Sequence, residues 1–309
     1  MDTAGRAARR VNGVRRRGAW KHGAPHPRAR DPREHTRTPR ETGARPGADP
    51  MSGRARSGVR PGGGPADRSG GGPATGPAWL SARRGAHYRA AVDLFCRSWA
   101  ALRAAVAGLA DEDFARPSGC AGWLVRDLVC HLVIDAQDVL ITLATPVTAA
   151  PTRDAVTYWE VSGTPPAGDD PLDALTVRLA AAYQDPALLR FHLDDLGSAA
   201  GRAADAADPG RTVGTRGEVL TTGEYLTAYV LEWTLHHLDL VAGLPQVPGP
   251  PAAGLARSRE LLERIAGTPF PAALPDSDAL RIGTGRRAPS GAERTRLGAL
   301  AGRLPFVLG

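Results

Sequence analysis

The chain has 309 residues and a formal net charge of +7, and this length allows one or two domains. The positive charge is confined to residues 1–78, which hold 17 Lys and Arg against 6 Asp and Glu, whereas residues 79–309 hold 22 against 26. Three cysteines are too few for a disulfide framework or a four-cysteine zinc site, and no apolar signal sequence follows the early arginines. We therefore expect a cytoplasmic protein.

Residues 1–78 are rich in arginine, glycine and proline and contain only three valines from the Val, Leu, Ile and Phe set. Such a segment cannot bury enough apolar surface to offset the entropy lost on ordering, so we predict a disordered tail. Its arginines would allow contact with nucleic-acid phosphates, but Trp20 is its single aromatic residue, and the lack of a stacking platform disfavours that interpretation. Met51 leaves open a shorter form that begins there.

Two amphipathic helices are predicted after this tail. The stretch from Trp79 to Leu109 places apolar residues at spacings of three and four, which forms one apolar stripe along a long helix. A second helix is predicted from about Trp123 to a residue before Pro146. Its most apolar part, residues 128–143, is interrupted by polar residues and is too short to cross a membrane, so we expect no membrane association.

The middle of the chain is less regular. Residues 146–171 are rich in Pro, Gly and Thr and are predicted to form a long loop. A third helical region is expected from Leu172 to Leu193, interrupted or bent at Pro186, because a proline cannot donate a helical hydrogen bond. The segment 204–221 is predicted to be irregular or weakly extended.

The fourth predicted helix has the best defined boundaries. Thr221 and Glu224 have the spacing of a capping box, and Gly243 with Pro245 just beyond it marks the end. Four long helices joined by modest loops predict a mainly α fold, an antiparallel four-helix bundle, over residues 79–245.

Residues 246–309 are expected to form a small extension that packs on this bundle. A short helix is predicted at 255–265 and a strand at Ala279–Gly283. A last helix would begin where Ser290 and Glu293 again have capping-box spacing. The extension is too small for a second full core.

The fourth helix carries the clearest chemical signal. Glu232 and His236 are four residues apart, so they share one helical face and can both reach one metal ion. They lie in an apolar segment where burial is costly without a partner, although such a pair also occurs as a solvated hydrogen-bonded couple. His131 in the second helix is the natural third ligand, and its alternative role is a core histidine bonded to a backbone carbonyl. Two imidazoles and one carboxylate leave zinc an open position, as in catalytic sites.

Other polar residues near these positions have simpler interpretations. His237 points about 100° away from His236 and is expected to be structural. Asp239 either orients a histidine or, as we prefer, pairs with an arginine, and Cys120 is expected to pack in a tight turn. Arg286 and Arg287 are weaker candidates: they would bind a substrate carboxylate if the extension folded over the bundle mouth, and a solvated turn is the alternative.

Two segments together resemble a known family. SGCAGWLVRDLVCHL (residues 118–132) and LEWTLHHLDL (residues 231–240) are similar to the metal-binding N-terminal domain of mycothiol-dependent maleylpyruvate isomerases, which belongs to the DinB-like helical bundles. The resemblance covers roughly residues 80–245. Residues 279–309 are similar to the short tail of many relatives and not to the larger C-terminal domain of the isomerase itself.

The resemblance implies that His131, Glu232 and His236 bind zinc or another divalent metal, and that mycothiol is the thiol cosubstrate. A thiol bound to such an ion is deprotonated, so we expect a thiol-dependent transferase or isomerase acting on a small electrophilic substrate. The alternative is a non-enzymatic metal-binding bundle or a regulatory bundle that binds a partner.

Overall fold

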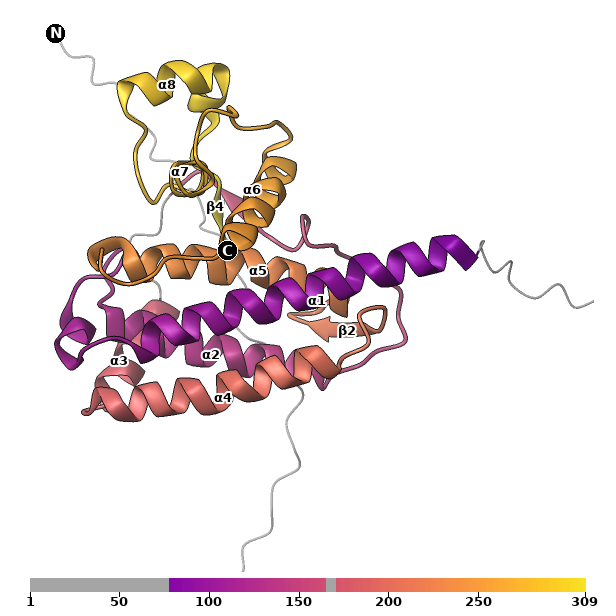
Figure 1. Ribbon diagram of the computed structural model, residues 1–309, viewed down its shortest axis with the longest axis horizontal. Coiled ribbons are helices and arrows are strands. Elements are labelled where there is room, and N and C mark those ends of the chain that lie inside the picture. The colour runs from indigo at the N-terminus through magenta and orange to yellow at the C-terminus, as the bar shows by residue number, and fades with distance from the viewer. Residues whose placement is uncertain (1–77, 165–170) are drawn as a thin grey trace, which may run out of the picture. The chain divides into compact units, whose positions relative to one another are not determined.

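The computed structural model describes residues 78–164 and 171–309, with side chains from residue 88 onward, so the predicted tail lies outside it except for Ala78. The described part is mainly helical, as expected (Figure 1). None of its helices is long and apolar enough to span a lipid bilayer. The α-helices are α1 (Ala78–Ala107), α2 (Val125–Leu143), α3 (Pro171–Ala182), α4 (Pro186–Ala206), α5 (Thr222–Leu240), α6 (Ala252–Ala266), α7 (Asp276–Gly283) and α8 (Gly291–Leu297).

The strands are short and form two antiparallel pairs. The first pair joins the segment after α2 to the last residues of the chain, and the second is a hairpin that leads into α5. Residues Arg216 and Gly217 form the two-residue hairpin turn, and both have positive φ, as in a type I′ turn. The pairs are β1 (Val161–Ser162) with β4 (Val307–Leu308), and β2 (Thr212–Thr215) with β3 (Glu218–Thr221).

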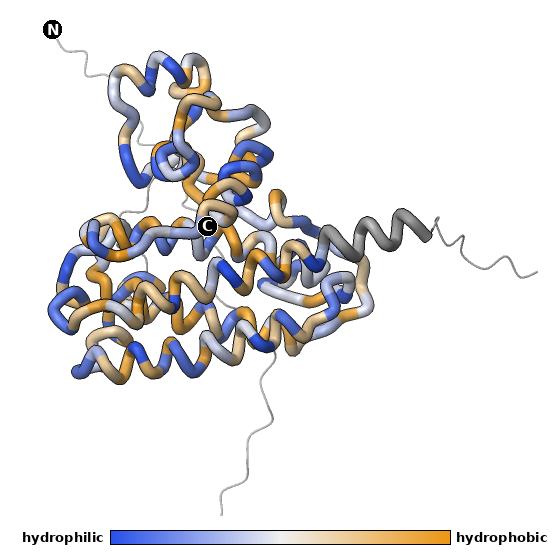
Figure 2. The backbone as a smooth tube through the Cα atoms, viewed as in Figure 1, coloured by the Kyte–Doolittle hydropathy of each residue, from blue (hydrophilic) through white to orange (hydrophobic). Residues whose placement is uncertain are grey.

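The main core lies among α1, α2, α4 and α5. Helix α1 packs on α4 and α5, and α2 packs on α4, while apolar positions recur along these helices (Figure 2). Trp99 of α1 stacks on Trp233 of α5, with ring centroids 3.8 Å apart, and its indole Nε1 donates to the Gly197 carbonyl of α4 at 2.8 Å. A Cβ at Gly197 would lie 2.8 Å from Trp99, so a glycine lets these helices approach.

Helix α5 is buried on nearly all sides. Residues such as Tyr229 and Trp233 face the main core, whereas Leu231 and Leu235 face a second apolar cluster built with α6, α7 and α8. A helix that is apolar around its circumference is a central helix. Polar side chains on α5 are therefore held in a largely buried environment, and that places the candidate site.

One element was predicted wrongly. Residues Ala279–Gly283 are not a strand but the second half of α7. The buried residues are Ala279, Leu280, Ile282 and Gly283, and their spacings of three and four residues are those of one face of a helix. Two acidic residues in the first turn, after Pro275, also favour a helix because they lie at its positive end.

The third helical region is interrupted at Pro186, one of the two predicted alternatives, and forms the two helices α3 and α4. Pro186 is the first residue of α4, and the Asp185 side chain caps this helix by accepting from the Ala187 amide at 2.8 Å. Helix α4 also extends to Ala206, into the segment predicted to be irregular. The rest of that segment is irregular at residues 207–211 and then extended in the hairpin of β2 and β3, as predicted.

The predicted cap of α5 forms in part. The Thr221 hydroxyl accepts from the Glu224 amide, as expected for the N-cap. The Glu224 carboxylate, however, accepts from the Ala155 amide at 3.0 Å and so anchors the long loop against the start of α5. At α8 the full capping box of Ser290 and Glu293 is present.

Candidate metal centre

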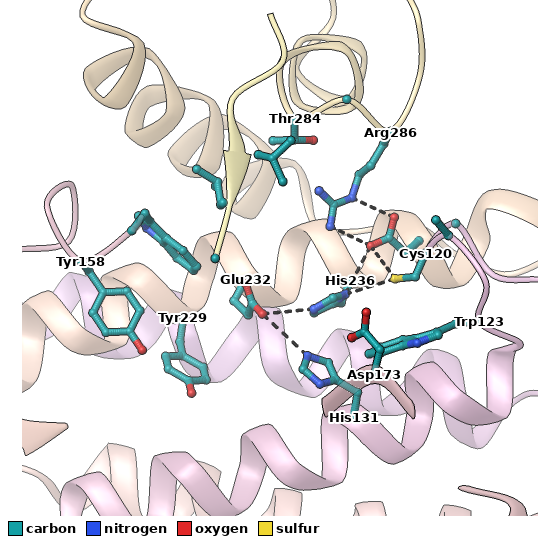
Figure 3. A pocket seen from close by; sticks show the side chains of 18 of the residues that line it. Cys120, Trp123, His131, Tyr158, Asp173, Tyr229, Glu232, His236, Thr284 and Arg286 are labelled. Atoms are coloured by element: carbon teal, nitrogen blue, oxygen red, sulfur yellow. Dashed lines mark hydrogen bonds and ion pairs between the residues drawn. The ribbon is translucent and has the colours of Figure 1, made fainter. Parts of the chain in front are cut away.

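Helices α2 and α5 bring together four side chains of the types that bind metal ions. His131 and Asp135 are one turn apart on α2, and Glu232 and His236 are one turn apart on α5. One candidate ligand atom of each residue lies within 4.8 Å of those of the other three. Figure 3 shows His131 and His236 both directed at Glu232. The three residues predicted from the sequence thus meet, and Asp135 joins them.

The candidate ligand atoms lie close together, but not every pair is within hydrogen-bond distance. Glu232 Oε1 lies 3.1 Å from His236 Nε2 and 3.8 Å from His131 Nε2. The two imidazole rings have centroids 4.8 Å apart and are nearly perpendicular, at 75°. Both histidines therefore present a ring nitrogen to the same carboxylate.

The loop before α2 is pressed against the end of α5. The Gly119 amide donates to the Asp239 carbonyl at 2.8 Å, and a Cβ at Gly119 would lie 2.7 Å from the Asp239 Cα. This contact places the Cys120 thiol where it donates to Asp239 Oδ2 at 3.3 Å. Burial raises the pKa of the Cys120 thiol, which favours the protonated form that donates this hydrogen bond.

Asp239 fulfils both roles considered for it. His236 Nδ1 donates to Asp239 Oδ2 at 3.3 Å, and Arg286 donates to both carboxylate oxygens at 2.8 and 2.9 Å. Burial opposes ionisation, but Arg286 and His236 outweigh it and hold the pKa of Asp239 below its usual range. With its Nδ1 hydrogen bonded to Asp239, His236 directs Nε2 at Glu232, as in metal sites whose histidine is oriented by a carboxylate.

Neighbouring charges in this cluster shift one another's pKa values. Although burial acts in the opposite direction, Glu232 raises the pKa of His236 well above its usual value, and His236 lowers that of Glu232. They form an ion pair. Asp135 differs, because burial, its largest influence, raises its pKa to about 6.

A cavity of about 410 Å³ opens onto the cluster. His131, Glu232 and His236 line it together with aromatic side chains, and its far wall comes from the end of the chain, including Arg286 (Figure 3). Arg216 of the hairpin turn also lines it, with its guanidinium 5.7 Å from the Tyr158 ring centroid. The arrangement can therefore hold a small molecule directly beside the donor atoms.

The other sequence candidates lie in distinct places. Arg287 pairs with Asp278 and Glu293 at 2.8 Å each and is not among the residues that line this cavity. His237 Nε2 donates to the Pro248 carbonyl at 2.9 Å, which is the structural role expected for it.

Two residues beside the candidate metal centre were not predicted from the sequence. Asp135 follows His131 at the same four-residue spacing that links Glu232 to His236, and this signal was available but not used. Arg216 carries no spacing signal, because only the hairpin brings it to the cavity.

The fold and the site define a mainly helical domain in which two helices supply histidine and carboxylate groups to one end of a cavity. Residues 95–241 match the family model of the mycothiol maleylpyruvate isomerase N-terminal domain. His131, Glu232 and His236 lie within the match, whereas Arg286 lies beyond it. A search of curated proteins and a search of solved structures gave no match.

Proposed function

We propose that His131, Glu232 and His236 bind a divalent cation, with zinc as the first choice, and that the protein is a cytoplasmic thiol-dependent transferase or isomerase. Its substrate would be a small electrophile and its thiol mycothiol. The observation that carries this proposal is the convergence of the three side chains beside a cavity of about 410 Å³. The family match of residues 95–241 supports the choice of thiol.

The residues present fit such an ion. Two ligands bonded to one tetrahedral ion at about 2.1 Å lie roughly 3.4 Å apart. The distances from Glu232 Oε1 to His236 Nε2 and His131 Nε2, 3.1 and 3.8 Å, bracket that value. Imidazole nitrogen and carboxylate oxygen are also ligands that zinc prefers.

The chain's own groups would prepare the site for this chemistry. A bound divalent cation supplies a Lewis acid that lowers the pKa of a thiol, so that the thiol reacts as its thiolate. Asp239 fixes the orientation of His236, and Arg286 neutralises Asp239 while its own position on the cavity wall makes it a candidate for a substrate carboxylate. The rings of Tyr158 and Trp123, which line the cavity, would pack against the electrophile.

The architecture proposed with this function is that of the DinB-like proteins. Helices α1, α2, α4 and α5 would form the four-helix bundle of residues 79–245, and residues 246–309 the extension. In such bundles, metal ligands project from facing helices into the interior, which agrees with the placement of His131 on α2 and of Glu232 and His236 on α5.

Metal analysis of the purified protein tests the proposal. We expect about one zinc per chain in the wild type and in His237→Ala, and little in His236→Ala. His237→Ala is a matched control, because it removes a neighbouring buried histidine that hydrogen bonds to Pro248 instead of facing Glu232. Equal, low zinc content in the wild type and His236→Ala would contradict metal binding.

Turnover separates an enzyme from a binding protein. With mycothiol and a set of electrophilic acceptors, we expect activity in the wild type that Glu232→Gln abolishes while the helical circular dichroism persists. Zinc binding without turnover of any acceptor would instead support a non-enzymatic metal-binding or partner-binding role.

A further inference from the structure

Asp135 has a buried carboxylate oxygen that accepts no hydrogen bond from the described residues. Its residue is 4% exposed, and its Oδ2 atom has no hydrogen-bond partner in the described part of the chain. Leaving a carboxylate oxygen buried and unsatisfied is costly, so such a group calls for an explanation. Both oxygens of Asp239, by contrast, accept from Arg286. Asp127 is intermediate: one oxygen accepts from the Leu124 amide, and the other has no hydrogen bond but lies 3.7 Å from Arg126 Nε.

The carboxylate oxygens around His131 Nε2 lie farther away than hydrogen-bond partners do. Asp135 Oδ2 lies 3.5 Å from this nitrogen and Glu232 Oε1 lies 3.8 Å from it, both too far for a normal hydrogen bond. A ring nitrogen carries at most one proton and so cannot satisfy two carboxylates in any case. Both distances are instead close to the separation of roughly 3.4 Å between two ligands of one tetrahedral ion.

The neighbouring carboxylate on α2 provides a contrast. Asp138 lies three residues further along and has the guanidinium of Arg216 3.9 Å from its Oδ2 atom. No arginine or lysine in the described residues pairs with Asp135, and the charged groups around it are His131, His236, Glu232 and Asp138. Among the described residues, no arginine or lysine thus balances the charge of Asp135.

We propose that Asp135 is a fourth protein ligand of the cation, an inference that rests on the proposed function of the same site. Two carboxylates and two neutral imidazoles would balance the double charge of the ion. Asp135 is not among the residues that line the cavity, whereas the other three are. Asp135 would therefore bind the cation from the side away from the cavity. Since zinc can expand to five ligands, a thiol could still bind it from the cavity side.

Cobalt substitution tests direct ligation. A cysteine that binds Co²⁺ gives an intense near-ultraviolet charge-transfer band, so we expect this band in Asp135→Cys loaded with Co²⁺ and not in the wild type or Asp138→Cys. A residue that only positions His131 would not produce the band. Its absence from a cobalt-loaded Asp135→Cys protein would overturn the proposal.

Zinc affinity, measured by competition with a chromophoric chelator, gives an independent test. We expect Asp135→Asn to bind zinc at least tenfold more weakly than the wild type, and Asp138→Asn to differ by less than threefold. Metal-free Asp135→Asn should have an unfolding midpoint in urea no lower than that of the wild type, since the change removes an unpaired buried charge. Equal zinc affinity in Asp135→Asn and the wild type would overturn the inference alone, whereas a wild type that binds no zinc would also refute the proposed function.

Discussion

Substitution of Arg286 by alanine should show how much its buried ion pair with Asp239 stabilises the fold. The Asp239 side chain is 2% exposed and would lose both bonds from Arg286, keeping only those from His236 and Cys120 at 3.3 Å. Removing one partner of a buried pair costs about 3–5 kcal/mol. Because the Arg286 side chain is 23% exposed, we expect the lower end, about 3 kcal/mol in the free energy of unfolding.

Urea unfolding followed by tryptophan fluorescence measures this loss. For an m value of about 2 kcal/mol/M, the midpoint should fall by roughly 1.5 M at pH 7. Arg287→Ala is the control: its side chain is 35% exposed and pairs with Asp278 and Glu293, so its loss should be about 1 kcal/mol or less. Equal losses for the two variants would refute the reasoning.

The difference between wild type and Arg286→Ala should also depend on pH. Arg286 and His236 hold the pKa of Asp239 below its usual value despite burial. A depressed folded-state pKa gives stability that is present above the unfolded pKa of about 4 and is lost as the pH falls toward the folded value. The stability difference should therefore narrow below about pH 4. A difference that stays constant down to pH 2 would show that the ion pair is not its source.

Three further predictions concern the loop, the metal and the core. Gly119→Ala should destabilise the protein and weaken zinc binding, because its Cβ would lie 2.7 Å from the Asp239 Cα on α5. Gly163→Ala is the control and should change neither property, because nothing lies within 4 Å of a Cβ there. Chemical unfolding and zinc titration of the two variants measure these effects. Zinc binding near neutral pH should release about one proton, because the raised pKa of His236 keeps this residue protonated without metal. Calorimetry in buffers of different ionisation enthalpy measures the number of protons released. A binding heat that does not depend on the buffer would contradict the prediction. Leu102 is fully buried, so Leu102→Ala should lower the free energy of unfolding by about 2–5 kcal/mol. Leu188 is 58% exposed, so Leu188→Ala should lower it by less than about 0.5 kcal/mol. Similar losses for the two variants would show that Leu102 does not lie in a packed core.

Local patterns predicted much of the architecture. The mainly helical class was confirmed, the full capping box forms at Ser290, and at Thr221 the N-cap hydrogen bond forms, because capping involves residues only three apart. The error at Ala279–Gly283 has the same origin. In a run of five residues, the periods of a strand and a helix are hard to tell apart, and burial against α6 decided for the helix.

The sequence by itself determined that Glu232 and His236 share a helical face, since four residues span about one turn of any α-helix. Only the tertiary structure decided that α2 turns His131 and Asp135 toward that face, and that the loop at Gly119 and the Arg286 side chain meet Asp239. These contacts join residues far apart in the chain, whose mutual placement follows from how the helices pack in the core and leaves no periodic trace along the chain.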